Sequence, residues 1–331
     1  MFKIAITSWA KAPAMGLLAS LALALAPPAT AQTFPNKVVK LVVPQTPGGA
    51  TDVFARAVGQ KLSERWGHPV VVENRAGAAG VVGTDAVAKS APDGYTLLVT
   101  YAGSQAINPA LYKSIPFDSI KDFQTIATVA QTPFALVVRP GFPAKDMPSF
   151  VKFARETKDA PSFASSGNGS VNHLLGEMLK MDSGIRYVHV PYKGISQAIT
   201  DLLGGQVDFA FTSLPSVLPN IKSGKIHALA VTSARRVAVA PDIPTIAESG
   251  VPQFDVNPWW GVLGPAGMDK EIVHKINADI TDILKSQEVI DFLAKQGAEP
   301  LVTTPDEFLD ILKSDTEKWA KVVKASGVHI N

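Results

Sequence analysis

Short apolar segments rich in β-branched residues alternate with segments of helical period along most of this 331-residue chain. Short apolar runs bounded by turn residues are typical of buried strands, and apolar residues three and four apart are typical of helices packed on a sheet. Strands are predicted at residues 38–43, 70–73, 96–101, 134–138, 162–164, 187–190, 207–211, 228–232 and 260–263. Helices are predicted at residues 51–66, 81–89, 149–157, 170–181, 195–203, 215–223, 270–285, 287–295 and 305–325. This alternation predicts an α/β fold with mainly parallel sheets and helices on their faces.

The beginning of the chain has the composition of an export signal. Lys3 and Lys11 are its only charged residues, residues 14–26 are apolar, and Ala29-Thr30-Ala31 is the small-x-small pattern that signal peptidases cut. The apolar run of about 13 residues is too short to span a membrane as a helix. We therefore expect a signal peptide at residues 1–31, cleaved near Ala31, and an exported, soluble mature protein.

Charge and cysteine content exclude several classes of function. The formal net charge is +2 for the whole chain and zero once the two lysines of the export signal are removed, whereas a nucleic-acid-binding protein needs a basic face. The chain has no cysteine, which excludes disulfides, cysteine-based zinc sites and thiol catalysis. The six histidines form no zinc-type pair or cluster, so no metal or other cofactor is expected.

The mature chain is long for a single core and suits two domains. Proline and glycine clusters at residues 140–143 and 261–267 are the strongest boundary signals. If they bracket an inserted domain, the chain leaves a first lobe, builds a second and returns. We expect one lobe from residues 32–132 and 255–331 and another from residues 133–254. Two interdomain crossovers would then form a hinge, with a ligand cleft between the lobes.

The segment Pro44-Gln-Thr-Pro-Gly-Gly-Ala-Thr-Asp52 joins the first predicted strand to the first predicted helix, and we call residues 44–52 the first glycine loop. Its two glycines permit positive φ and let a ligand approach the backbone. The amides of Ala50, Thr51 and Asp52 follow at a helix N-terminus, where the helix dipole favours an anion. No lysine follows, as a phosphate-binding P-loop would require.

Asp52 lies in the first turn of that helix and has two interpretations. It is a capping residue, which would stabilise the start of the helix by about 1 kcal/mol, or it also orders the loop. In either case its negative charge would repel a polyanion such as a phosphate. The first glycine loop therefore suits a weaker anion, such as a carboxylate.

A second strand–glycine–helix sequence contains Ser165-Ser-Gly-Asn-Gly-Ser-Val-Asn-His173, and we call residues 165–173 the second glycine loop. Gly167 and Gly169 match half of a dinucleotide fingerprint, but Asn172 stands at the third glycine position and the expected acidic residue downstream is missing. If the two glycine loops face each other across a cleft, their amides and hydroxyls clamp one anion from both sides. The hydroxyls concerned are those of Thr51, Ser165, Ser166 and Ser170.

No catalytic group assembles from the sequence. A Gly-x-Ser-x-Gly elbow is absent. Ser170 and His173 would form an unusual dyad on one helix, and a packed or cleft-lining histidine is the plainer interpretation. The acidic residues available for a hydrolytic pair lie on different predicted elements; they are Asp52, Glu177, Asp201 and Asp208. We therefore predict that the protein binds a ligand and is not an enzyme.

Six segments together make the chain resemble the Bug-type periplasmic solute receptors of tripartite tricarboxylate transporters. They are VPQTPGGATDVFAR, VVVENRAGAAGVVGTDAVAKSAPDGYTLL, INPALYKSIPFDSIKDF, SSGNGSVNHLLGEM, VPYKGISQAITDLLGGQVDFAF and WWGVLGPAGMDKEIVHKIN. Single glycine motifs are common, whereas this ordered set covers essentially the whole mature chain and is highly specific.

The resemblance implies a two-lobed, Venus-flytrap fold of the type II periplasmic-binding class and a location in the periplasm. In such receptors the backbone and hydroxyl groups of the two loops hold a carboxylate, often through bridging water. The ligand-binding residues that the resemblance implies are Gln45, Gly48, Gly49, Ala50, Thr51, Asp52, Ala102, Gly103, Ser104, Ser166, Gly167, Asn168, Gly169, Ser170, His173 and Asp208. Two of these assignments have an equally plain alternative: residues 102–104 as a turn needed for packing, and Asp208 as a hydrogen-bonded residue at a strand end.

Gln45 departs from the family pattern, because many relatives carry an aromatic residue after the proline of this loop. A glutamine offers an amide that can donate or accept a hydrogen bond, which indicates a more polar ligand or a wider pocket. The ligand stays open among dicarboxylates, tricarboxylates, amino acids, aromatic acids and neutral vitamin-like molecules.

The resemblance implies an extracytoplasmic receptor that delivers a small carboxylate-type solute to integral-membrane transporter components. Two alternatives are an exported enzyme on the same scaffold and a sensing module for a membrane kinase. We expect a monomer with no nucleic-acid partner.

Overall fold

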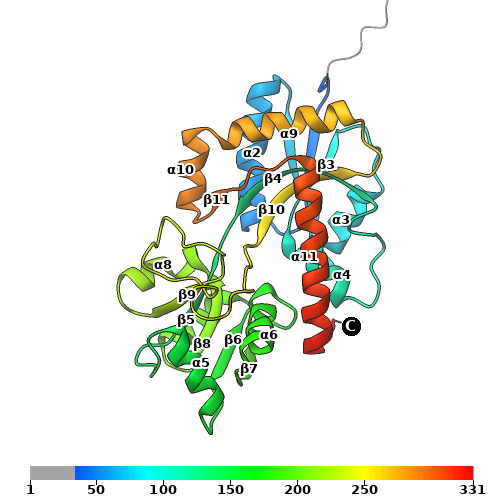
Figure 1. Ribbon diagram of the computed structural model, residues 1–331. Coiled ribbons are helices and arrows are strands. Elements are labelled where there is room, and N and C mark those ends of the chain that lie inside the picture. The colour runs from blue at the N-terminus through cyan, green and yellow to red at the C-terminus, as the bar shows by residue number, and fades with distance from the viewer. Residues whose placement is uncertain (1–33, 331) are drawn as a thin grey trace, which may run out of the picture. The chain divides into compact units, whose positions relative to one another are not determined.

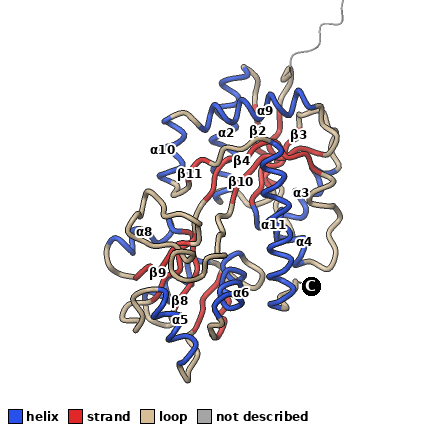
Figure 2. Tube along the Cα trace, viewed as in Figure 1, coloured by secondary structure: helices blue, strands red, loops and turns tan. Residues whose placement is uncertain are grey.

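The computed structural model describes residues 34–330. The expected signal peptide and its cleavage site at Ala31 lie outside these residues. From Lys37 onward the chain forms one compact unit, which contains two β-sheets with helices around them (Figure 1, Figure 2). No helix among the described residues has both the length and the apolar character of a membrane span.

Within residues 34–330, the first sheet has six strands in the order β11-β4-β10-β3-β1-β2. Their bounds are β1 Val39–Val43, β2 Val70–Asn74, β3 Thr96–Tyr101, β4 Phe123–Gln131, β10 Trp259–Pro265 and β11 Glu299–Pro300. β1 is parallel to β2 and β3, whereas β10 is antiparallel to β3 and β4. The sheet therefore combines strands from the beginning and the end of the compact unit.

In the same described part of the chain, the second sheet has five strands in the order β7-β6-β8-β5-β9. Their bounds are β5 Phe134–Val138, β6 Ser162–Ser165, β7 Val188–Pro191, β8 Phe209–Ser213 and β9 His227–Val231. β6 is parallel to β7 and β8, and β5 is antiparallel to β8 and β9. This sheet is built from one continuous stretch of sequence.

The α/β fold is as predicted, but the sheets are mixed rather than mainly parallel. In the first sheet β4 leads the chain out toward the second sheet, and β10 brings it back. A returning strand starts at the edge where its neighbours end, so it must run against them. β10 therefore pairs antiparallel with both β3 and β4.

Helices flank both sheets (Figure 2). Their bounds are α2 Ala50–Trp66, α3 Val81–Ala88, α4 Asn108–Leu111, α5 Met147–Glu156, α6 Val171–Ser183, α7 Ile195–Leu203, α8 Leu214–Lys222, α9 Lys270–Leu284, α10 Gln287–Lys295 and α11 Pro305–Ser326. A 3-10 turn at Ala78–Gly80 precedes α3, and a π-helical turn at Gly103–Ile107 precedes α4. All the helices and strands predicted from the sequence are present, with ends shifted by at most two residues.

β4 is a central strand that the sequence did not predict. Its segment FQTIATVAQ places threonines among its apolar residues, and both Thr125 and Thr128 are buried. Their hydroxyls donate to backbone carbonyls, Thr125 to Pro305 O at 2.8 Å and Thr128 to Leu301 O at 2.6 Å. Because distant partners satisfy these polar groups, the strand is buried without an uninterrupted apolar run.

Two short crossovers join the sheets. The first is Thr132 and Pro133, between β4 and β5, and the second is residues 255–258, just before β10. The amide of Thr132 donates to Pro258 O at 3.0 Å, so the crossovers lie side by side. The proline and glycine clusters expected to mark the boundaries lie elsewhere. Residues 140–143 follow β5, and residues 261–267 form most of β10 and the turn after it.

The helix α11 contacts elements of both sheets. It packs on β4 of the first sheet and on α6, which follows β6 of the second (Figure 1). Leu174 and Leu175 of α6 share one buried apolar cluster with Trp319 and Val323 of α11. The C-terminal half of α11 therefore joins the two halves of the compact unit.

Candidate functional site

Both glycine loops leave their sheets at the edge nearest the crossovers. β3 ends at Tyr101, which pairs with Trp260 at the start of β10, and β1 runs parallel to β3. In the second sheet, the end of β8 at Ser213 pairs with Phe134, the first residue of β5, and β6 runs parallel to β8. The loops that follow β1 and β6 therefore both start beside the crossovers, at the carboxyl ends of their strands, where ligands of α/β proteins commonly bind.

A further contact places the second glycine loop beside elements of the first sheet. A Cβ added to Gly169 would lie 3.1 Å from side-chain atoms of both Leu111 and Ile330. Leu111 ends α4, and the amide of Ile330 donates to Leu111 O at 3.0 Å. α4 continues from the π-helical turn that carries Ser104, a side chain bonded to the first glycine loop.

Asp52 holds the first glycine loop in place. It is 3% exposed, and its Oδ2 accepts hydrogen bonds from the Gly48 amide at 2.9 Å and from Arg56 Nε at 3.0 Å. Its Oδ1 accepts from Asn74 Nδ2 at 2.9 Å. Burial alone would raise the pKa of Asp52, but the hydrogen bonds from Arg56, Gly48 and Asn74 outweigh it and lower the pKa. Asp52 thus orders the loop, and its charge is compensated locally.

The start of α2 leaves backbone donors free. Gly49 is the N-cap and supplies no side-chain cap. The first helical bond runs from Val53 N to Gly49 O, and within residues 34–330 the amides of Ala50, Thr51 and Asp52 have no acceptor. Unpaired N–H groups at a helix N-terminus attract a negative group.

Thr51 adds one side-chain donor. Its hydroxyl oxygen accepts from Trp260 Nε1 at 3.0 Å, which leaves the hydroxyl proton available. The Trp260 ring packs edge-on against Phe54 of α2 and stacks on Tyr101. Trp260 therefore fixes the Thr51 side chain from the end of the crossover.

The stretch Ala102, Gly103 and Ser104 packs against the first glycine loop and is hydrogen-bonded to it through Ser104. All three residues are buried, and Ser104 Oγ accepts from Gln45 Nε2 at 2.8 Å and donates to Ala79 O at 3.1 Å. The Ser104 proton is thus already used inside the protein. Residues 102–104 thus pack as a buried turn, and their part in a cleft wall stays a prediction.

The second glycine loop bends at Gly167 and Gly169, with φ of +119° and +75°. Its hydroxyls are turned inward: Ser165 lies 2.7 Å from His189 Nε2, Ser166 donates to Asn172 Oδ1 at 2.6 Å, and Ser170 donates to Gly167 O at 2.7 Å. A hydroxyl carries one proton, so these serines have none left for a ligand. The donors that this loop can offer are therefore its backbone amides and the side-chain amide of Asn168, which is exposed.

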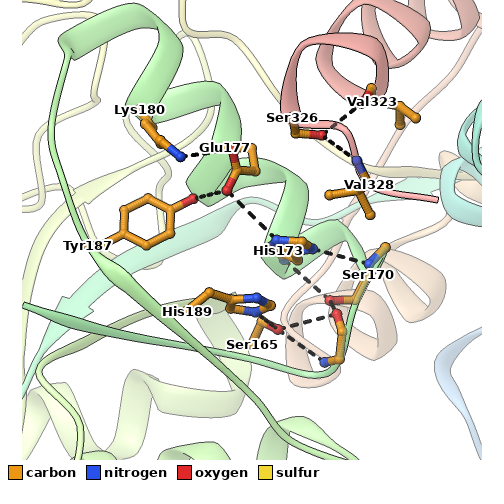
Figure 3. Close-up of polar contacts among 12 residues, drawn as sticks. Ser165, Ser170, His173, Glu177, Lys180, Tyr187, His189, Val323, Ser326 and Val328 are labelled. Atoms are coloured by element: carbon orange, nitrogen blue, oxygen red, sulfur yellow. Dashed lines mark hydrogen bonds and ion pairs between the residues drawn. The ribbon is translucent and has the colours of Figure 1, made fainter.

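The side chain of His173 is turned into the protein. It is 5% exposed, its Nδ1 accepts the amide of Gly169 at 3.2 Å, and its ring stacks on His189 (Figure 3). Burial first, and then the neighbouring His189, lower the pKa of His173 to about 4, so the ring is neutral at pH 7. Among residues 34–330, the hydroxyl of Ser170 bonds only the backbone amide of His173 and Gly167 O, an arrangement unlike a Ser–His dyad.

Asp208 lies at the amino-terminal end of β8, whereas the second glycine loop starts at the carboxyl end of β6. The prediction that Asp208 forms part of the pocket wall is therefore wrong. Asp208 precedes β8, and its carboxylate accepts from Arg139 Nε at 2.8 Å and from the Ser162 amide at 2.8 Å. Ser162 is the first residue of β6, whereas the second glycine loop follows the last. Because β6 and β8 are parallel, the length of β6 separates Asp208 from the loop. Asp208 is the hydrogen-bonded strand-end residue of the alternative interpretation.

The four carboxylates considered for catalysis have separate partners. Asp52 is bound by Arg56 and Asp208 by Arg139, while Glu177 accepts from Tyr187 and Asp201 from Tyr192. None of these bonds joins two of the four carboxylates.

Several residues that hold the loops were missed in the sequence. Trp260, Asn74, Asn172 and His189 each bond to a loop residue or to its side chain. Apart from Asn172, their partners are more than 20 residues away in the chain. No local pattern marks such contacts. The tandem tryptophans after the second crossover were the one available signal.

Comparison with known proteins shows which families and solved structures this chain is similar to. A family model described as the tripartite tricarboxylate transporter family receptor matches residues 54–328. Protein BugT of Bordetella pertussis is 38% identical over 307 residues, which is 92% of this chain and 94% of BugT. The solved structure of Rpa4515 from R. palustris with adipate is 34% identical with a TM-score of 0.76, covering 89% of this chain and 99% of that chain. MatC from Rhodopseudomonas palustris with bound malate is 32% identical with a TM-score of 0.71, covering 88% of this chain and 100% of that chain.

Proposed function

The chain belongs to the receptor family of the tripartite tricarboxylate transporters, and we propose that it holds its carboxylate solute between the two glycine loops. This family is the one that the sequence segments resemble. Its members are periplasmic solute receptors that work with membrane components of the transporter. Our proposal concerns which residues of this chain recognise the solute.

The uncapped start of α2 is the observation that supports this site most strongly. Three successive amides have no acceptor within the described residues, and the charge of Asp52 in the same helical turn is compensated by Arg56. A carboxylate placed there gains charge-assisted hydrogen bonds of about 1.5–3 kcal/mol each. Several such bonds, less the cost of immobilising the ligand, correspond to micromolar affinity, about −8 kcal/mol.

We further propose a short dicarboxylate as the ligand class. Adipate and malate, which are named with the two solved relatives, are both dicarboxylic acids. The amides of the first glycine loop would hold one carboxylate. The second glycine loop, whose Ser166 and Asn168 amides have no acceptor among residues 34–330, would take part from the other side of the cleft. The buried Oε1 of Gln45, which lacks a partner there, favours a ligand with a donor group, such as a hydroxyl.

The remaining parts of the proposal concern location and partners. The export signal would be removed near Ala31, and the mature protein would act as a monomer in the periplasm with two lobes that close on the ligand. Delivery to a transporter is favoured over catalysis because the candidate carboxylates are each bound to separate partners. A sensing role would use the same site and differ only in the membrane protein that meets the closed form.

A thermal-shift screen of refolded, ligand-free protein tests the ligand class. The panel is malate, succinate, adipate, citrate, aspartate and benzoate. At 100 times its dissociation constant, a bound dicarboxylate is expected to raise Tm by roughly 5 °C. A panel in which only benzoate shifts Tm would contradict the dicarboxylate class while keeping the receptor function.

Gly49→Val tests the position of the site. Gly49 has φ −78°, and a Cβ there would come no closer than 3.8 Å to Thr46 O, so the variant should fold. Its side chain would cover the free amides and is expected to weaken binding of the dicarboxylate selected by the screen by about 100-fold. Gly204→Val is the matched control, because Gly204 also has φ −78° and is the C-cap of α7, outside both glycine loops. Equal affinity of both variants in calorimetry would refute the assignment of the first glycine loop.

A further inference from the structure

Two stacked imidazole rings lie next to the second glycine loop and are hydrogen-bonded to it. The rings of His173 on α6 and His189 on β7 are 3.9 Å apart between centroids and 6° from parallel. Figure 3 shows them between Ser165 on one side and Glu177 on the other. His173 is buried and His189 is partly buried, so the pair forms part of the support under the loop.

The hydrogen bond to Gly169 determines the tautomer of His173. Its Nδ1 accepts the Gly169 amide at 3.2 Å and therefore carries no proton. The proton is then on Nε2, which faces Glu177 Oε1 at 3.8 Å. Glu177 is oriented by the hydroxyl of Tyr187, which donates to Oε1 at 2.6 Å, and by Lys180 at 3.6 Å from Oε2. A carboxylate on this side favours the same tautomer.

His189 acts on the other glycine through Ser165. The Ser165 hydroxyl lies 2.7 Å from His189 Nε2 and accepts the Gly167 amide at 3.1 Å. Gly167 O lies farther from Ser165 Oγ, at 3.2 Å, and already accepts from Ser170. The single proton of Ser165 is therefore best placed toward His189, whose Nε2 acts as the acceptor.

Each imidazole thus fixes one of the two glycines at which the loop bends. The amides of Gly167 and Gly169 are both turned toward the protein interior, and both residues have positive φ. The amides of Ser166 and Asn168 have no acceptor within residues 34–330. Holding the glycine amides inward keeps these two donors unpaired.

We propose that His173 and His189 are a pair of positioning residues that hold the second glycine loop in its ligand-accepting conformation without touching the ligand. The inference rests on the proposed function, since it assigns these residues a role in the same site. It replaces the direct ligand contact that the sequence predicted for His173. The sequence had no indication of a role for His189.

The pair works only while both rings are neutral, because a protonated imidazole has no acceptor. Burial first, and then His189, lower the pKa of His173 to about 4, with Glu177 opposing them. Burial also lowers the pKa of His189, again opposed by Glu177. Lys180 on α6 and Tyr187, which precedes β7, are further titratable groups that meet Glu177 near the pair.

Amide hydrogen exchange in the ligand-free protein tests the two bonds directly. The amide of an asparagine replaces the δ position of an imidazole and that of a glutamine replaces the ε position. His173→Asn should therefore keep the acceptor for Gly169, and His173→Gln should lose it. At the second position the order reverses, because Ser165 bonds Nε2: His189→Gln should keep the bond and His189→Asn should lose it. Loss of a bond is expected to speed exchange at Gly169 or Gly167 by about tenfold or more.

The crossed pattern separates positioning from packing. A residue that only fills space would tolerate the same substitute at both positions. Equal exchange rates for the Asn and Gln variants at each position, with Tm values matched by circular dichroism, would overturn the proposal.

Calorimetry with malate and adipate then links the loop to binding. His173→Gln and His189→Asn are expected to weaken binding about tenfold, and the paired rescuing variants by less than about threefold. Faster exchange with unchanged affinity would also contradict the proposal, because the loop would then be ordered for no ligand-related reason. A wild-type protein that binds neither acid would instead contradict the proposed ligand class, and the exchange pattern would still show whether the two histidines order the loop.

Discussion

The first glycine loop is held by a carboxylate, whereas the second is held by hydroxyls and neutral imidazoles. Asp52 accepts from Gly48, Arg56 and Asn74 in the first loop. In the second loop the Gly167 amide donates to the Ser165 hydroxyl, and the Gly169 amide donates to His173 Nδ1. Both loops follow a strand and open a helix, yet different chemistry orders them. A shared backbone pattern therefore does not imply a shared response to charge, salt or pH.

The largest expected effect comes from removing the carboxylate of the first loop. Asp52→Ala leaves the Gly48 amide without its acceptor, and we expect dicarboxylate binding to weaken by about 100-fold. The unfolding free energy should fall by roughly 2 kcal/mol, because charged hydrogen bonds are lost. Urea unfolding and calorimetry measure the two effects.

Asp208→Ala is the matched control for that comparison. Asp208 is also a carboxylate bound by an arginine, but it lies at the edge of the second sheet away from the loop. A similar loss of stability is expected, roughly 2 kcal/mol, with affinity unchanged within about twofold. If both variants lose affinity equally, Asp52 affects binding through the stability of the whole protein and not through the order of the first glycine loop.

Lowering the pH should affect the two loops differently, with a smaller change in the free energy of unfolding than in dicarboxylate affinity above. The folded pKa of His173 is about 4, below its ordinary value of 6.5. As pH falls from 6.5 toward 4, the unfolded chain takes up a proton that the folded chain does not, so stability is lost in this window. The loss is at most about 3 kcal/mol. The pKa of Asp52 is lowered below 3.8, so the stability it provides is kept until the pH falls below that value.

Urea unfolding of the wild type and His173→Asn at pH 7, 5.5 and 4.5 measures this difference. The wild type should lose stability relative to the variant as the pH falls. Parallel curves for the two proteins would show that His173 titrates normally and would remove the contrast with the first loop.

The smallest effect is expected from Arg56→Gln. The Arg56 side chain is 53% exposed, so its ion pair with Asp52 is screened by solvent. Asp52 keeps its bonds to Gly48 and Asn74 in this variant. We expect dicarboxylate affinity to change by about twofold or less at 0.15 M salt, and by more at low salt. A loss as large as that of Asp52→Ala would mean that Arg56, rather than the loop geometry, attracts the ligand.

Local periodicity predicted most of the fold, because strand and helix patterns depend on neighbouring residues. β4 was missed since its buried threonines interrupt the apolar run, and their partners at Pro305 and Leu301 lie far along the chain. The proline and glycine clusters that served as boundary signals lie elsewhere, one after β5 and the other in β10 and the turn that follows it. The segments that connect the two sheets, such as Thr132-Pro133, are too short to leave a compositional signal of their own.

The candidate site shows the same division. The glycine loops and the ordering role considered for Asp52 followed from residues close in sequence, whose hydrogen bonds span only a few positions. The placement of Asp208 did not, because a strand-end residue can lie at either edge of a sheet until the register is known. The inward turn of the serine hydroxyls likewise depends on distant partners such as His189.

The sequence by itself determined that this protein has an α/β fold with two glycine-rich helix starts, since those features depend on backbone geometry and short-range periodicity. Only the tertiary structure decided which donors stay unpaired and which are used internally. A hydroxyl proton or an imidazole nitrogen can serve one partner at a time, and for Ser165, His173 and Thr51 that partner is set by how strands and helices pack.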